Sequence, residues 1–166
     1  LRGSWRQRIS SRDALQETLQ EMGKLLTGYD SLEEILIQVL ELLDQVVEFD
    51  SCSLILLDEN QGVYLAASRG IDRVDRLEQG LAEHAEKFLP AHWEGDKTIY
   101  LPDTRKSEDW FFLLETAYIR SWIGAALMVK DRYIGLLNVD HRRVDAYARE
   151  DIRMVKAFAD QAAVAI

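Results

Sequence analysis

The chain has 166 residues, of which 48% are hydrophobic and 30% charged, and its formal net charge is −9. This length can bury a sizeable core in one domain without metal ions or disulfides, and the acidic balance argues against nucleic acid as a partner. One cysteine excludes an intrachain disulfide, and no membrane-spanning run or signal peptide is visible, so we expect a cytoplasmic protein.

The first twelve residues differ in charge from the rest of the chain, because they carry four arginines and no acid. We therefore expect a basic linker at residues 1–12 and a single domain at residues 13–166. The linker suits the cytoplasmic flank of an absent membrane-spanning helix, or else it is a solvated segment or a vector remnant. The first residue is Leu1 rather than Met, which favours an excised fragment.

Two helices are predicted near the N-terminus. Apolar residues recur at three- and four-residue steps in residues 13–27 and again in residues 30–48. The second helix begins with the capping residues Asp30 and Glu33. Some apolar residues fall outside the main stripes: Leu25, Ile37 and Leu42. They indicate either a second buried face within the domain or a homodimer through the terminal helices.

The middle of the chain predicts a hairpin, a helix, a short strand and a second short helix. Residues 51–57 and 63–69 are apolar or β-branched runs with a polar connection between them, which is typical of a β-hairpin. A weakly amphipathic helix is predicted over residues 74–88. A short strand over 98–101 and a helix over 107–116 follow.

Residues 121–141 form the stretch around which the fold is organised. Two apolar runs flank a charged break at Asp131 and Arg132, which predicts a β-hairpin with its turn at these two residues. Both runs are apolar at almost every position, as in strands that are covered on both faces. We therefore expect a layer of structure on each side of this sheet.

The turn position sets the register and therefore the sheet face on which each side chain lies. With the turn above, Asn138 pairs with Ala125, and Ser121 and Asp140 share their face. The opposite face is rich in small residues: Gly124, Ala126 and Gly135. It suits the alanine-rich helix predicted over residues 148–166, which leaves the Asn138 face for a pocket.

This order of elements resembles a GAF domain, the small-molecule sensor module of signalling proteins. The residues that carry the resemblance are the hairpin SWIGAALMVKDRYIGLLNVD, the following YAREDIRMVKAFADQAAVAI and the loop containing Leu101, Pro102 and Asp103. The resemblance implies an α/β (α+β) fold with a GAF/PAS-like, mainly antiparallel sheet of five or six strands. It also implies that terminal helices pack on one face and that lid loops and short helices cover the other.

The lid expected from the resemblance coincides with a cluster of aromatic residues. Seven of the 15 aromatics lie between Trp93 and Trp122, and such rings form either core packing or the walls of a pocket. Asn138 lies among apolar residues, so its amide needs a partner in the protein, in water or in a ligand. The candidate ligand-binding residues are Asp103, Trp110, Phe111, Tyr118, Ser121 and Asn138.

Catalysis is not expected, since there is no Gly-x-Ser-x-Gly nucleophile motif, and the cysteine and histidines lack the spacing of a metal site. Cyclic-nucleotide-binding relatives carry an Asn-Lys pair where this chain has His141 and Arg142. Bilin-binding relatives attach the chromophore to a cysteine in a loop or lid, whereas Cys52 falls in the first predicted strand. Methionine-sulfoxide-reducing relatives need several cysteines. No cofactor is therefore predicted.

The sequence is compatible with two functions. The first is a non-catalytic sensory domain of a signal-transduction protein such as a two-component system, which binds a small cytoplasmic ligand and relays it through its terminal helices. Its output domain, a kinase, cyclase or transcription factor, is expected outside this sequence. The second is a GAF-like dimerisation module without a ligand, whose cavity is filled by Trp110, Phe111 and Tyr118.

Overall fold

The computed structural model describes residues 20, 23, 31–60, 62–88, 98–108 and 110–166. Its helices and strands are, in chain order, α2 (Leu32–Val46), β1 (Ser51–Leu57), β2 (Val63–Arg69), α3 (Val74–Glu83), β3 (Thr98–Leu101), β4 (Ser121–Val129), β5 (Arg132–His141) and α4 (Arg149–Ala165). Short 3-10 turns occur at Ala85–Phe88, Thr104–Lys106 and Leu114–Thr116. The predicted linker 1–12 and helix 13–27 lie outside the described residues, apart from Gln20 and Gly23.

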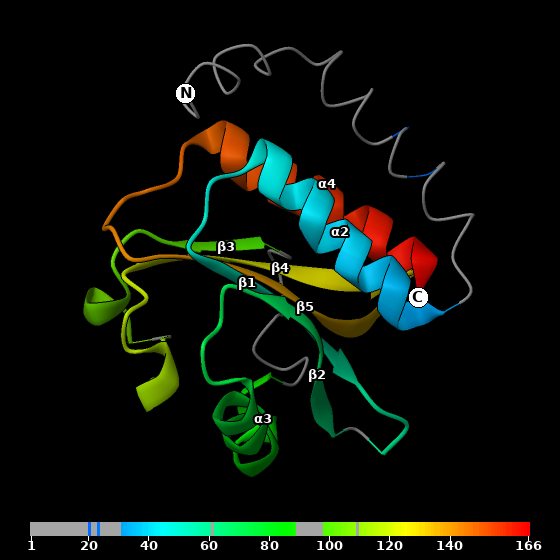
Figure 1. The fold of residues 1–166 in the computed structure, drawn as a ribbon, viewed down its shortest axis with the longest axis horizontal. Helices are drawn as coiled ribbons and strands as arrows, with labels where there is room; N and C mark the ends of the chain where they lie inside the picture. Colours follow the sequence, from blue (N-terminus) through cyan, green and yellow to red (C-terminus); the bar gives the residue numbers. More distant parts are fainter. Residues whose placement is uncertain (1–19, 21–22, 24–30, 61, 89–97, 109) are drawn as a thin grey trace.

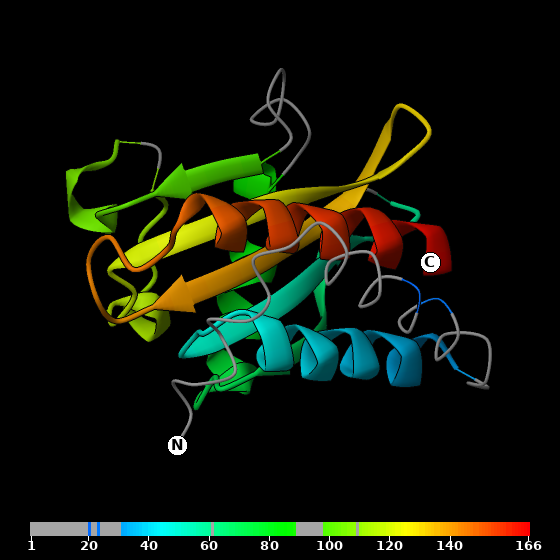
Figure 2. The ribbon, with the colours of Figure 1, turned by 90° about the horizontal axis from the view of Figure 1, so that it is seen from above.

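The five strands form one antiparallel sheet in the order β2-β1-β5-β4-β3. The helices α2 and α4 lie side by side and run in opposite directions across one face of the sheet (Figures 1 and 2), whereas α3 lies on the other face. This arrangement confirms the predicted fold class. In the described part of the chain, no helix is both long and apolar enough to cross a membrane.

Helix α2 follows from its cap and its apolar stripe. The Ser31 side chain accepts the amide of Glu34 at 3.3 Å, and two glutamates in the first turn complement the helix dipole. The buried residues recur at helical spacing along the face that meets the sheet: Leu36, Val39, Leu40 and Leu43. Leu42 is buried in the same core, whereas Ile37 is 42% exposed.

Helix α4 closes the main core. The Ala148 amide donates to the Asp151 carboxylate at 2.8 Å, which satisfies one amide at the helix N-terminus. Its buried face consists mainly of Phe158 and alanines, and the small side chains let the backbone approach the sheet. It packs on alternate residues of β4 and β5: Ile123, Ala125, Leu127, Leu137 and Val139.

The predicted hairpin is present, but its turn lies one residue earlier than predicted. Strand β4 ends at Val129 and β5 begins at Arg132, so that the turn consists of Lys130 and Asp131, with Lys130 in the left-handed region at φ 49°. An irregularity between Leu127 and Met128 shifts the pairing once more. Beyond it, Asn138 lies opposite Gly124 instead of Ala125.

The corrected register reverses the two faces of β4 and leaves those of β5 as predicted. Asn138 and Asp140 face away from α4, as expected. Ser121 does not share their face, because it lies opposite His141 on the side of α4. Gly124 and Ala126, which were predicted on the face of α4, instead share the face of Asn138. A shift of one residue in pairing exchanges the faces because side chains alternate along a strand.

The segment before β4 also differs from the prediction. A helix was predicted over residues 107–116, but the described part of this range contains only the 3-10 turn Leu114–Thr116. Asp103 caps an earlier turn by accepting the amide of Arg105 at 3.2 Å, and Ser107 ends that turn instead of starting a helix. Trp110 packs against Trp122 of the sheet and Phe111 against His84 at the end of α3, so tertiary contacts override the local capping preference.

Candidate ligand-binding site

A cavity of about 440 Å³ lies between the Asn138 face of the sheet, α3 and the segment that joins β3 to β4. Its size falls within the usual range of small-molecule sites. Most of its described walls are apolar. The sheet contributes Ile55, Ile99, Trp122 and Leu136, and helix α3 contributes Leu77 and Leu81. The neighbouring segments contribute Ile71, Trp110, Phe111, Leu113 and Ile119. The polar lining residues are Ser53, Lys87, Glu108, Thr116, Tyr118, Asn138 and Asp140.

Aromatic rings shape two parts of the wall. The rings of Trp110 and Trp122 meet edge to face with their centroids 5.6 Å apart, which is a favourable geometry for an aromatic pair. The ring centroids of Phe111 and His84 are 4.9 Å apart. The Lys87 ammonium lies 6.0 Å from the centroid of the Phe111 ring. These contacts hold the segment before β4 against the sheet and the end of α3.

Asn138 is fixed by the protein and keeps hydrogen-bonding capacity. Its side-chain oxygen accepts the indole N–H of Trp122 at 3.0 Å, and its amide nitrogen donates to the Ser53 hydroxyl at 3.2 Å. An asparagine side chain has two N–H groups and two acceptor lone pairs. These two bonds therefore leave one N–H and one lone pair for other partners.

A buried carboxylate lies at the same face of the cavity. Asp140 is 4% exposed and accepts a hydrogen bond from the Ser51 hydroxyl at 2.8 Å. Burial raises the pKa of Asp140 to about 7, the Ser51 hydrogen bond opposes this rise, and the Asp50 carboxylate adds to it. The Asp140 carboxyl group can therefore gain or lose a proton near neutral pH.

Tyr118 joins this group from the segment before β4. Its hydroxyl lies 2.6 Å from the Ser51 hydroxyl, and burial raises the pKa of Tyr118 to about 12, so the phenol stays protonated at neutral pH. Because the Ser51 hydrogen is directed to Asp140, the Tyr118 hydroxyl is the donor to Ser51. The two hydroxyl hydrogens thus point in series towards the carboxylate.

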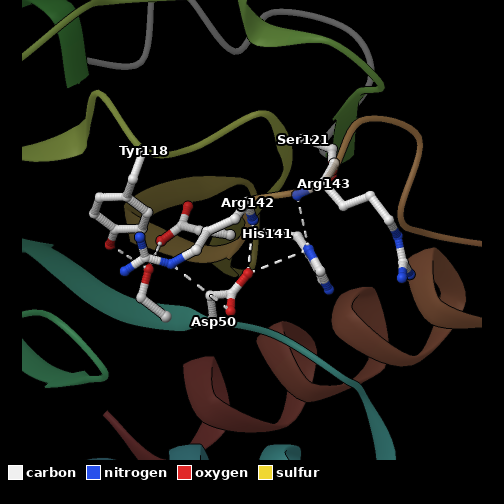
Figure 3. A network of polar contacts seen from close by, with 8 residues as sticks. Asp50, Tyr118, Ser121, His141, Arg142 and Arg143 are labelled. Carbon is white, nitrogen blue, oxygen red and sulfur yellow. Dashed lines mark hydrogen bonds and ion pairs between the residues drawn. The ribbon is translucent and has the colours of Figure 1, made fainter.

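Just beyond this cavity wall, Asp50 contacts Arg142 and His141 (Figure 3). Its carboxylate accepts the backbone amide of Arg142 at 2.7 Å and lies 3.9 Å from the Arg142 Nε. The Arg142 guanidinium lies over the Tyr118 ring, 4.5 Å from the centroid. The Nδ1 of His141 lies 3.2 Å from Asp50 and also accepts the amide of Arg143 at 3.0 Å. Since an accepting nitrogen carries no proton, Nδ1 accepts from Arg143 when it has no hydrogen and donates to Asp50 when it has one.

Four of the six predicted site residues line the cavity: Trp110, Phe111, Tyr118 and Asn138. Asp103 and Ser121 are not among its lining residues. Asp103 lies beside Arg120 at 3.3 Å and caps a 3-10 turn. Ser121 donates to the backbone oxygen of Arg143 at 2.7 Å on the opposite face of the sheet. The structure therefore brings the aromatic residues and the amide together and separates the other two from them.

Sequence reasoning missed three polar or aromatic residues that the sheet contributes to the cavity lining: Ser53, Trp122 and Asp140. Asp140 had been assigned to the correct face but was not chosen as a site residue. Ser53 carried a usable pattern, because Ser51 and Ser53 alternate with apolar residues in β1 and so mark one face. Trp122 was missed because the wrong register pointed it towards α4.

Cys52 and the acidic residues show no arrangement for metal or redox chemistry in the described part of the chain. No group of three or more histidine, cysteine, aspartate or glutamate residues there could hold a metal ion. Cys52 lies in the core beneath the helices rather than in the cavity. Burial raises the pKa of the Cys52 thiol above its usual range, with the charge of Asp140 adding to the effect, which disfavours the reactive thiolate.

Comparison with known proteins gives one family. The family model of the GAF domain matches residues 31–166. A similar solved structure is the GAF domain from an Acinetobacter phosphoenolpyruvate-protein phosphotransferase, with 20% identity, 93% of each chain covered and a TM-score of 0.73. The search of curated proteins gave no match.

Two further similar structures hold a small molecule. The free methionine-R-sulfoxide reductase from Neisseria meningitidis, in complex with its substrate, has 15% identity and a TM-score of 0.69, with 92% of this chain and 88% of that chain covered. The phycoerythrobilin-bound GAF domain from a cyanobacterial phytochrome has 14% identity and a TM-score of 0.69, with coverages of 91% and 92%. At these identities the likeness establishes the fold alone.

Proposed function

This chain belongs to the GAF domain family of sensory and regulatory modules, and we propose that it is a non-catalytic sensor that binds a small molecule in its cavity. The observation that carries the proposal is the cavity itself. Trp110, Phe111 and Tyr118 line it and leave about 440 Å³ open, instead of filling it as a module without a ligand would require. Apolar walls with a few oriented polar groups are the usual composition of a small-molecule site.

The relay to the rest of the protein runs through the chain segments that join the cavity to the helices. Asp50 lies between α2 and β1, Arg142 lies between β5 and α4, and their contacts link the two segments. Tyr118, a cavity residue, contacts the Arg142 guanidinium. A ligand that moves Tyr118 thereby acts on both helices. It shifts their arrangement only if it binds one arrangement more tightly than the other.

The proposed function is non-catalytic, because the described lining of the cavity contains no activated nucleophile. Cys52 lies on the opposite sheet face, buried and with a raised thiol pKa, so it does not reach a ligand in the cavity. The similar methionine-R-sulfoxide reductase is an enzyme, and the same reaction here would need accessible cysteines that can form a disulfide. The signal would instead pass to a kinase, cyclase or transcription factor domain of a cytoplasmic signalling protein.

Native mass spectrometry of the purified domain tests the proposal. We expect a small molecule retained from the expression host, which leaves the protein on denaturation. Leu113 lines the cavity, and its neighbour Leu114 is 76% exposed. The variant Leu113→Trp should fill part of the cavity and lose the retained molecule, whereas Leu114→Trp should keep it.

Two results would contradict this function. Binding would be shown to occur outside the cavity if Leu113→Trp retained the molecule and Leu114→Trp lost it. An empty wild-type protein that also fails to bind any compound of a metabolite library would favour the dimerisation module.

The outer faces of α2 and α4 favour a homodimer as part of the same function. Apolar residues there remain exposed: Leu32, Ile37, Val164 at 82% and Ile166. A second copy would cover them and couple the helices of the two protomers. A variant with both Leu19→Glu and Ile37→Glu should be monomeric, as measured by light scattering. Leu19 lies outside the described residues. Phe112→Glu, at an exposed residue of the β3–β4 segment, is the control and should leave the mass unchanged.

A further inference from the structure

The Asp140 carboxylate is buried without a counter-charge among the described residues. It lines the cavity while being 4% exposed, and its hydrogen-bond partner is the Ser51 hydroxyl. Within the described residues, Asp140 forms no ion pair with a lysine, arginine or histidine. A buried carboxylate without a cation is costly, and this cost is the reason that burial raises the pKa of Asp140 to about 7.

The neighbouring cations are engaged elsewhere. The Arg142 guanidinium stacks on Tyr118 and lies beside Asp50, with Nε 3.9 Å from the Asp50 carboxylate. Lys87 lines the cavity but is exposed and lies beside Phe111. Glu108, which is also exposed, carries the opposite charge to Lys87. With Asp140 ionised, the described lining therefore carries a net negative charge.

The hydrogen-bond geometry around Asp140 suits the ionised form. Tyr118 donates to Ser51, and Ser51 donates to Asp140, so two hydroxyl dipoles point towards the carboxylate. Hydrogen bonds directed at a carboxylate favour its charged state. The site thus combines two aligned hydroxyl dipoles, which stabilise a negative charge on Asp140, with a cavity that this carboxylate lines.

Aromatic rings lie next to this charge. In the sheet register Trp122 lies directly opposite Asp140, so the two side chains are neighbours on the cavity face. Trp110 packs against Trp122 and lines the cavity as well. The face of an indole ring attracts an organic cation, and a carboxylate beside it adds a full opposite charge. An indole face beside a carboxylate is suited to binding protonated or quaternary amines.

We propose that the cavity takes a small organic cation, with its ammonium group between Asp140 and Trp122 and its apolar body against the aromatic and aliphatic walls. The inference rests on the proposed function, since it names the class of ligand for the same cavity. An anion is disfavoured because it would meet a buried carboxylate. A neutral ligand would leave Asp140 without a counter-charge.

Three probes with a similar skeleton and different charge test the inference: 2-phenylethylammonium, 2-phenylethanol and phenylacetate. Their affinities are measured by isothermal titration calorimetry on the whole purified domain after removal of any retained molecule. We expect the ammonium compound to bind with a Kd about tenfold below that of the alcohol, and phenylacetate to bind most weakly. This order tests the inference on the wild-type protein without any variant.

Variants then assign the preference to one residue. Asp140→Asn keeps the shape and an acceptor for Ser51 but removes the charge, so the ammonium Kd should rise about tenfold while the alcohol Kd stays within about twofold. Glu108→Gln removes the same charge from the exposed part of the lining and should preserve the preference for the ammonium compound. Circular dichroism and the melting temperature check that both variants fold.

The possible failures are distinguishable. Equal affinity for the three probes, or tighter binding of the alcohol, would overturn the inference and leave the ligand-binding function in place. Binding of none of the probes would also overturn it, and the native mass spectrum then decides on the proposed function separately. An ammonium preference that survives Asp140→Asn but is lost in Glu108→Gln would refute the assignment to Asp140.

Discussion

The two faces of the central sheet differ in what their side chains do, although they come from the same strands. On the face under α2 and α4, alternate residues of β4 and β5 are fully buried hydrocarbon, as for Ile123, Leu137 and Val139 at 0% exposure. On the other face, the same strands carry Asn138 and Asp140 and border a cavity. Adjacent residues of one strand therefore belong to two different environments.

This difference indicates that the helix face stabilises the fold and that the cavity face reduces the stability of the fold. Close packing under the helices supplies dispersion contacts and hydrophobic burial. The cavity face forgoes such contacts and buries polar groups at a cost. A departure of this kind from well-packed, apolar structure is expected where a protein binds something. Substitutions on the two faces test this difference.

The largest effect is expected from two neighbouring leucines of β5. Leu137 is 0% exposed under the helices, and Leu136 is 2% exposed beside the cavity. Leucine-to-alanine changes in cores cost about 2–5 kcal/mol, depending on how many atoms surround the site. Leu137→Ala should lie in the upper half of that range and Leu136→Ala near its lower end, as measured by urea unfolding. Equal losses would show that the cavity face is packed as tightly as the helix face.

The next effect concerns Asn138, which the sequence left between a structural and a ligand-binding role. Its amide bonds Trp122 and Ser53, so Asn138→Leu removes one buried hydrogen bond from each of these partners. We expect a loss of about 1–3 kcal/mol in the free energy of unfolding. Ser53→Ala in the Asn138→Leu background should cost less than in the wild type, which a double-mutant cycle measures. Additive losses would show that the hydrogen bond to Ser53 contributes nothing.

A pH effect follows from Asp140 on the cavity face. Its pKa rises from 3.8 to about 7 on folding, so between these values the folded state binds more protons than the unfolded state. The contribution of Asp140 to stability is therefore present below pH 3.8 and is lost as the pH rises towards 7, by at most about 1.4 kcal/mol for each pH unit. Asp140→Asn should remove this slope. Identical pH profiles of wild type and variant would contradict a raised pKa.

The smallest effect is expected at Tyr147, whose phenol is buried in the core under the helices. The Tyr147 hydroxyl has no hydrogen-bond partner among the described residues. Tyr147→Phe should therefore raise the free energy of unfolding by about 1 kcal/mol, since it removes an unpaired polar atom. Tyr100→Phe is the matched control, because the Tyr100 hydroxyl donates to Asp145 at 2.9 Å and its loss should destabilise the fold. Destabilisation by both changes would indicate a bound water at Tyr147.

The sequence predicted most of the fold because its local patterns agree with its tertiary structure. Strands β1, β2 and β3 occupy the predicted residues, since polar connections mark their ends. The turn between β4 and β5 was misplaced by one residue because Lys130, Asp131 and Arg132 are all polar and none has the glycine that marks a hairpin turn. The irregularity beside Leu127 has no sequence pattern either. Together they reversed the faces of β4.

The candidate site was predicted in part, for the same reasons. The aromatic segment and Asn138 stood out by composition, and four of the six chosen residues line the cavity. Ser121 was lost through the register. The environment of Asp140 could not be read locally, because its partner Ser51 is 89 positions away and Tyr118 reaches Ser51 from 67 positions away. Only the folded chain brings these three groups together.

The opposite directions of α2 and α4 have a geometric consequence for protein engineering. The first turn of α2 lies next to the last turn of α4 at the same end of the domain (Figures 1 and 2). A fold whose entry and exit points are neighbours can be inserted into a surface loop of a host protein with little strain on the host. The ends of residues 31–166 are therefore placed for grafting into a fluorescent protein, whose emission would report whether one helix rotates against the other.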